Sequence, residues 1–204
     1  MVSVLLVLLI AAAALKFRME RLDLRPFHGD EAVQAVKAGE LFDGGLYIYN
    51  PYEFHGPSLY YFTLPILKLR GVQRFADARD GDFRLVPVLF GTGLILLLLP
   101  MRRALGTVAC LTSAVLLAAS PAMVFFSRYY IQEMVLAFFA ALALLSLWRI
   151  FCKQSAVGMV MLGLAGHDVC HQGNQRHFLR RTGCRLWLAG DVPSPPRGSQ
   201  VVAR

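Results

Sequence analysis

Long apolar runs, most of them closed by basic residues, constrain this chain more than any other feature. Residues 85–100, 107–126 and 135–151 each approach the length of a bilayer-spanning helix, which needs about 20 apolar residues. Residues 1–15 form another run, slightly short for a full crossing. This run lacks the basic leader of a signal peptide and an Ala-x-Ala exit followed by a soluble domain, and more spans follow it, so we interpret it as a first span. With 56% hydrophobic residues, the chain is also too apolar for an ordinary soluble domain.

Two shorter segments between the first and second runs predict helices on the membrane surface. Residues 33–42 carry Val33, Val36 and Leu41 at helical spacing, which indicates an amphipathic helix in the plane of the membrane. Residues 59–69 are apolar and aromatic but only about half the length of a span, and their tyrosines suit an interface. The predicted fold class is an all-α integral membrane protein, with about four transmembrane helices and surface-lying helices in the first outer loop.

The charges between the runs predict an orientation. With four spans and the N-terminus inside, the basic residues that close the second and fourth runs fall inside with no acids among them, as the positive-inside rule prefers. The acids Asp30, Glu31 and Glu133 then share the outer face. If residues 59–69 also spanned, Glu133 would lie opposite Asp30, so we prefer four spans. The inside residues are Arg102, Arg103, Arg149 and Lys153, and the basic residues left outside are Lys16, Arg18, Arg21 and Arg25.

The net charge and the cysteines limit the partners and cofactors. A formal net charge of +8 on a membrane protein indicates cytoplasmic loops or nearby anionic lipid. No basic face with the context for nucleic-acid binding is present. The four cysteines show no paired spacing, so no disulfide framework is predicted. The cofactor stays unknown, because a divalent cation is compatible with the sequence but not indicated by it. The soft ligands near the C-terminus fit no standard zinc spacing; they are His167, Cys170, His171, His177 and Cys184.

The adjacent acids Asp30 and Glu31 are the first candidates for chemistry. Ionisable groups beside a bilayer are costly, so they usually have a function. A carboxylate there can act as a general base, and His28, two residues away, could tune or assist it. Alternatively, Asp30 caps a helix that runs through Glu31, because Asp is a favoured N-cap. Glu133 is a further acid at the start of the last long run.

Basic and aromatic residues on the same predicted face complete the candidate site. Arg128 offers a planar donor fork that suits a phosphate, or it pairs structurally with Glu133. Arg84 is either part of the site or an interface anchor that snorkels. His55 and Tyr60 lie on the outer face, where aromatic rings could support a sugar. The simpler interpretation is a loop histidine and an aromatic-belt tyrosine.

Four motifs follow one another in a familiar order. They are HGDEA at 28–32, YEFHGPSLYY at 52–61, RLVPVLFG at 84–91 and SRYYIQEM at 127–134. As a set they resemble the N-terminal part of polyprenyl-phosphate-sugar-dependent glycosyltransferases with the GT-C membrane fold, the superfamily of protein O-mannosyltransferases and lipid A aminoarabinose transferases. The resemblance covers about residues 1–165. It implies sugar transfer from a polyprenyl-phosphate carrier to an acceptor on the outer face of a cell (plasma or inner) membrane, by a multi-pass protein surrounded by membrane lipid. It leaves the sugar and the acceptor open.

The resemblance implies a role for each matching residue. Asp30 matches the acid of the first outer loop, which acts as the base on the acceptor in an inverting transfer, and Glu31 is its usual companion. Glu133 matches the second outer acid, which lines the same cavity, so all three acids are predicted catalytic residues. The predicted substrate-binding residues, with the two arginines as ligands of the lipid phosphate, are His28, His55, Tyr60, Arg84 and Arg128.

Two other classes of function stay open on the sequence. A transporter or channel subunit would bind ions through acids near the middle of its spans, whereas the acids here lie at helix ends. A non-catalytic membrane subunit or scaffold needs no chemistry from this chain. Family members also have more spans and often a further outer domain. We therefore expect a truncated or frameshifted member that is inactive alone.

The composition changes after residue 166. We divide the chain into a glycosyltransferase-like region, residues 1–166, and an atypical tail, residues 167–204, which is either disordered or out of frame. The tail contains no Lys, Glu, Ile, Tyr or Met. Permitted codons for residues 167–179, read one base later, encode a string that would continue the interrupted apolar helix.

The DNA around codon 166 tests the frameshift hypothesis. We expect the forward-shifted frame to stay open and to encode further apolar spans. Sequencing of the gene decides, and prompt stop codons in that frame would contradict the idea.

Overall fold

The computed structural model describes residues 2–47 and 56–152. Every regular element in these two ranges is a helix, and neither range contains a strand. The predicted all-α class is therefore confirmed. The helices are α1 (Val2–Met19), α2 (Gly29–Phe42), α3 (Ser58–Leu69), η1 (Phe75–Asp77), α4 (Asp80–Leu96), α5 (Leu98–Leu105), α6 (Thr107–Ala119), α7 (Pro121–Ser127) and α8 (Glu133–Phe151).

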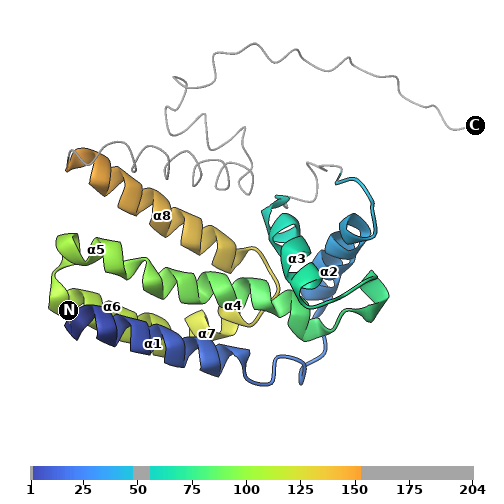
Figure 1. Cartoon of the computed structure of the whole chain (residues 1–204), viewed down its shortest axis with the longest axis horizontal. Helices are drawn as coiled ribbons and strands as arrows, with labels where there is room; N and C mark the ends of the chain where they lie inside the picture. The colour runs from blue at the N-terminus through green and yellow to red at the C-terminus, as the bar shows by residue number, and fades with distance from the viewer. Residues whose placement is uncertain (1, 48–55, 153–204) are drawn as a thin grey trace, which may run out of the picture.

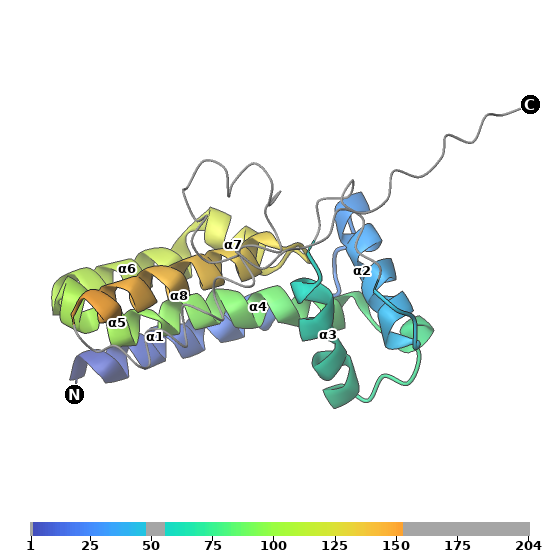
Figure 2. The same ribbon diagram turned by 90° about the horizontal axis from the view of Figure 1, so that it is seen from above.

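The long helices run side by side in a bundle with α4 at its centre, packed against α1, α7 and α8 (Figures 1 and 2). Three segments are long and apolar enough to cross a bilayer: α1, α4 continued by α5, and α8. Helices α6 and α7 pass the same test only as a pair, which bends by 61°. Counted as one broken span, this pair gives the fourth of the four predicted spans.

Helices α2 and α3 lie together at one end of the bundle, across the direction of the long helices (Figure 2). Neither qualifies as a membrane span, in agreement with the predicted surface helices. Helix α2 buries Ala35 and Ala38 against the core and leaves Val33 and Val36 about half exposed, at 52% and 47%. Two of the three apolar positions seen in the sequence thus face away from the protein, as a helix on a membrane surface requires, whereas Leu41 packs against the core.

The break between α6 and α7 follows from Pro121, the first residue of α7. Proline has no N–H, so the carbonyl of Leu117, four residues earlier, loses its helical donor. Arg18 of α1 replaces that donor, because its Nη2 lies 2.8 Å from the Leu117 oxygen. Arg18 is fully buried, and its Nε and Nη1 have no hydrogen-bond partner within the described ranges. Arg18, which was predicted to lie in an outer loop, is therefore buried in the bundle, where it stabilises the bend between α6 and α7.

A glycine sets the close approach of α4 to the two helices that flank the 128–132 loop. A Cβ on Gly91 would come within 2.9 Å of Ser127 Cβ and 3.3 Å of Met134 Sδ. Small residues permit such close backbone approach between helices in a membrane. Gly91 therefore fixes where α7 ends and α8 begins relative to α4.

We expect Gly91→Ala to lower the free energy of unfolding by about 1–3 kcal/mol, because the added methyl group overpacks a crowded contact. A denaturant titration of the detergent-solubilised protein measures this change. Gly29→Ala is the matched control, since a Cβ there meets nothing within 4 Å. Equal stability of the two variants would show that α4 does not depend on this contact.

Candidate active site

A buried carboxylate, Glu31, holds the end of the bundle that carries the other acids. Its side chain is 0% exposed and accepts five hydrogen bonds. Two come from Arg84 and one from Arg25, each at 2.9 Å. The backbone N–H groups of His28 and Tyr130 donate the other two, at 3.1 and 2.9 Å. Glu31 thus joins α2 and α4 to the loops on either side of the site.

Arg84, like Glu31, has a hydrogen-bond partner for each of its polar side-chain groups. A guanidinium offers five N–H groups. Besides the two bonds to Glu31, Arg84 donates to the carbonyl oxygens of Leu22 and Arg25 at 2.7 Å and of Pro26 at 3.3 Å. No N–H of Arg84 is left for a substrate phosphate in this arrangement. The sequence placed Arg84 at the phosphate, whereas the structure shows it fixing the 22–26 loop to Glu31.

The ion pair sets the charge of Glu31. Burial alone would raise the pKa of this carboxyl, because it disfavours the charged form. The hydrogen bonds from Arg84 and from the Tyr130 and His28 N–H groups outweigh burial and, with the charge of Arg84, lower the pKa below its ordinary value. Glu31 is therefore ionised and held by donors, which suits a positioning residue better than a proton acceptor.

Asp30, by contrast, is exposed. Its side chain is 74% exposed, and its Oδ2 lies 3.6 Å from Nδ1 of His28. The alternative role as helix cap is wrong, since α2 begins one residue earlier, at Gly29, with His28 as its N-cap. The backbone N–H of His28 is bound by Glu31, so the cap and the ion pair together fix the first turn that carries Asp30.

The three predicted acids gather around one aromatic residue, Tyr129. Burial raises the pKa of Tyr129, and the charges of Asp30, Glu31 and Glu133 raise it further, while Arg25 opposes them. Arg25 lies over the Tyr129 ring, 5.0 Å from its centroid. The three acids therefore lie at the same end of the bundle, as the prediction of four spans requires.

Arg128 and Glu133 do not pair with each other within the described ranges. Arg128 donates from Nη2 to the carbonyl oxygens of Glu20, at 2.7 Å, and Arg21, at 3.3 Å. Glu133 is exposed in the first turn of α8. The structural alternative proposed for this pair is wrong.

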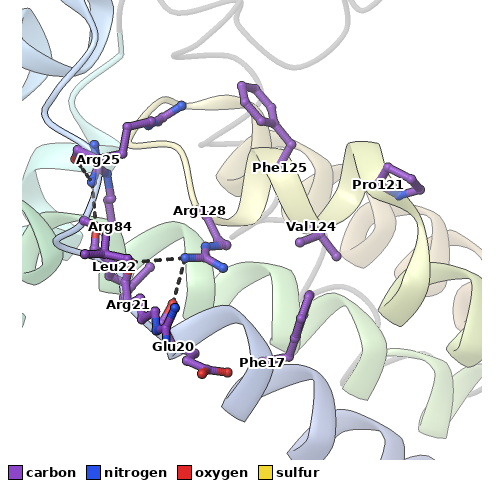
Figure 3. A pocket seen from close by; sticks show the side chains of 11 residues that line it. Phe17, Glu20, Arg21, Leu22, Arg25, Arg84, Pro121, Val124, Phe125 and Arg128 are labelled. Atoms are coloured by element: carbon purple, nitrogen blue, oxygen red, sulfur yellow. Dashed lines mark hydrogen bonds between the residues drawn. The ribbon is translucent and has the colours of Figure 1, made fainter.

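A cavity of about 640 Å³ opens beside Arg128, where α7 bends away from the end of α1 (Figure 3). This volume lies in the range of small-molecule sites. Arginines and apolar residues share its lining, and Glu20 is the acid among them. The apolar lining residues are Phe17, Leu22, Leu24, Pro121, Val124 and Phe125, and the basic ones are Arg21, Arg25, Arg84 and Arg128.

Two predicted substrate residues lie elsewhere. Tyr60 is fully buried in the core, where its hydroxyl donates to Gln34 Oε1, and burial raises its pKa well above the ordinary value. It is thus withheld from substrate in this arrangement. His55 lies outside the described residues.

Sequence reasoning missed Arg25 and Tyr129 as parts of the site. Arg25 precedes the acids in a loop without periodicity, so no pattern indicated that its side chain returns to Glu31. Tyr129 lies within the SRYYIQEM motif, which was the available signal. No group of three or more His, Cys, Asp or Glu side chains that could hold a metal occurs in the described ranges.

The family model of the dolichyl-phosphate-mannose-protein mannosyltransferases matches residues 58–166, more than half of the chain. The chain belongs to this family. No curated protein and no solved structure matches it. The predicted resemblance to GT-C glycosyltransferases is confirmed, and the chain is a multi-pass membrane glycosyltransferase sequence of the class that uses polyprenyl-phosphate-linked sugar donors. The match begins at Ser58, so it does not include the acidic pair.

We expect Glu31→Gln to lower the free energy of unfolding at neutral pH by about 3–5 kcal/mol, because it leaves the buried Arg84 without its counter-ion. The pKa of Glu31 is lower in the folded state, so its contribution is present above the unfolded value of about 4.3 and is lost as the pH falls below it. The stability gap between wild type and variant should therefore narrow in acid. Denaturant titrations across pH measure the gap.

The control for this experiment is Glu40→Gln, an exposed glutamate on the same helix. It should leave stability nearly unchanged. If Glu31→Gln behaves like Glu40→Gln, the ion pair does not hold this end of the bundle.

Proposed function

We propose that this protein transfers a sugar from a polyprenyl-phosphate carrier to an acceptor on the outer face of the membrane, with Asp30 as the acceptor-activating base. The observation that supports this role is the contrast within the acidic pair. Glu31 is buried and both its oxygens are hydrogen-bonded, whereas Asp30 is exposed on a helix turn that Glu31 holds in place. A fixed, accessible carboxylate is what general-base catalysis needs.

The proposed reaction is a single displacement. Asp30 takes the proton from the acceptor's nucleophilic atom as that atom forms a bond to the anomeric carbon of the donor sugar. The bond from that carbon to the phosphate oxygen breaks, and the electron pair leaves with the polyprenyl phosphate. His28, 3.6 Å from the Asp30 carboxylate, is placed to receive or relay the proton.

We assign the lipid phosphate to the cavity beside Arg128. Arginine forms charge-assisted, often bidentate bonds to phosphate. With Arg84 saturated, Arg128 together with Arg21 and Arg25 supplies the positive charge at the cavity. The apolar lining, which includes the exposed Phe17 and Leu24, suits the first part of a polyprenyl chain.

The remaining predicted residues keep narrower roles. Glu133 is proposed as the second acid of the site, because its side chain is exposed and its charge raises the pKa of Tyr129. His55 stays a predicted substrate contact, and Tyr60 is proposed to support α2 through Gln34. Residues 1–166 are proposed as the glycosyltransferase-like region, in the plasma or inner membrane. The 167–204 tail lies outside the described residues.

Asp30→Asn should abolish sugar transfer while leaving expression and stability intact, because the amide cannot accept the proton. The assay follows label from a panel of polyprenyl-phosphate-linked sugars into acceptors in membranes that contain the protein. Asp77→Asn, an exposed aspartate beyond the site, is the matched control and should transfer normally. Transfer retained by Asp30→Asn would refute the assigned role.

A binding measurement separates donor capture from chemistry. Arg128→Gln should weaken binding of decaprenyl phosphate to the purified protein by about tenfold or more, since a charge-assisted hydrogen bond contributes about 1.5–3 kcal/mol. Asp30→Asn should bind this lipid as well as wild type does. Arg74→Gln, an exposed arginine away from the cavity, should also leave binding unchanged. Equal binding by Arg128→Gln would place the phosphate elsewhere.

A further inference from the structure

A second, smaller cavity lies at the end of the bundle opposite the acids. It has a volume of about 290 Å³ and lies between α5 and the C-terminal end of α8, at the end of the bundle where the N-terminus of α1 also lies (Figure 1). Its lining contains three guanidinium groups, an indole and two apolar residues. These residues are Leu99, Pro100, Arg102, Arg103, Trp148 and Arg149.

Few acidic residues lie near the arginines of this cavity in the sequence. No Asp or Glu occurs between Asp82 and Glu133, or between Glu133 and Asp168. Arg102 is held in place by one hydrogen bond, from its Nη1 to Ser3 Oγ of α1 at 2.8 Å. That bond joins a neutral acceptor, and no carboxylate of residues 2–47 or 56–152 pairs with Arg102 or Arg103. These two arginines give the cavity a positive charge that suits an anion.

The surroundings of the cavity indicate the source of the anion. Arg103 and Arg149 are at the end of helices that are apolar enough to span the bilayer, so the cavity lies at the depth of the lipid headgroups. Leu105, at 41% exposure, and Leu147, at 40%, lie on the outside of the same two helix ends. Trp148 lines the cavity, and tryptophan is the residue that prefers this interfacial layer. An acyl chain can thus lie on apolar surface while its phosphate meets the arginines.

We propose that this cavity, which we name the basic cavity, binds the phosphodiester headgroup of an anionic phospholipid. Basic pockets between transmembrane helices are the known setting for such headgroups. The guanidinium forks match phosphodiester oxygens, and the indole and the leucines receive the glycerol and the first methylenes. The basic cavity is separate from the cavity beside Arg128, and the proposal does not depend on the assigned reaction.

Lipid retention by the purified protein tests the proposal. The full chain in detergent is mixed with phosphatidylglycerol or with phosphatidylcholine of the same acyl chains, and bound lipid is counted by native mass spectrometry. Wild type should retain phosphatidylglycerol preferentially. The variant R102Q/R103Q/R149Q should lose that preference by about 100-fold, at roughly fivefold for each arginine.

Two further variants keep the outcome decisive. R103Q/R149Q preserves the Arg102–Ser3 bond and with it the contact between α1 and α5, and it should weaken binding by about 25-fold. K16Q/R74Q/R79Q removes the same charge from exposed residues elsewhere and should retain the lipid. Equal retention of both lipids, loss in the control variant, or wild-type retention by both arginine variants would overturn the proposal. Displacement of the lipid by millimolar inorganic phosphate would also overturn it, in favour of a site for free phosphate.

Discussion

The buried ion pair between Glu31 and Arg84 is the interaction on which the acid-bearing end of the bundle depends. Removing two charges from water is costly, and the cost is met here because every N–H of Arg84 and both oxygens of Glu31 have partners. These partners come from α2, α4 and the two loops that approach them. A single salt bridge thereby sets the position of a helix turn, of Arg25 and of Tyr130.

The same pair explains why two adjacent acids have different environments. Neighbours on a helix point about 100° apart, so Glu31 can face the core while Asp30 faces outward. Glu31 supplies rigidity, and Asp30 presents an exposed carboxylate. A lone carboxylate on a loop would have the second property without the first. Rigid placement of a reactive group is a general requirement for efficient catalysis.

The sequence predicted the spans well and the local geometry of the site less well. Run length decides whether a helix can cross a bilayer, so three spans and the two short helices could be predicted directly, and the fourth predicted span corresponds to the bent pair. Pro121 was the available signal for the break inside 107–126, but a proline in an apolar run does not say by how much the helix bends. The role of Arg84 could not be predicted, because the same guanidinium serves a phosphate or a carboxylate 53 positions away equally well. Only the folded chain shows which acceptor it meets.

The bent pair α6 and α7 presents a short straight helix to the surrounding membrane. Helix α6 has 13 residues before the bend, which at about 1.5 Å per residue is roughly 20 Å of straight helix. A hydrocarbon core of about 30 Å is thicker than that. A bilayer meets such a short face by thinning locally. Three residues of α7 line the cavity beside Arg128, so we expect the headgroup layer to come closest to the bundle on the side of that cavity.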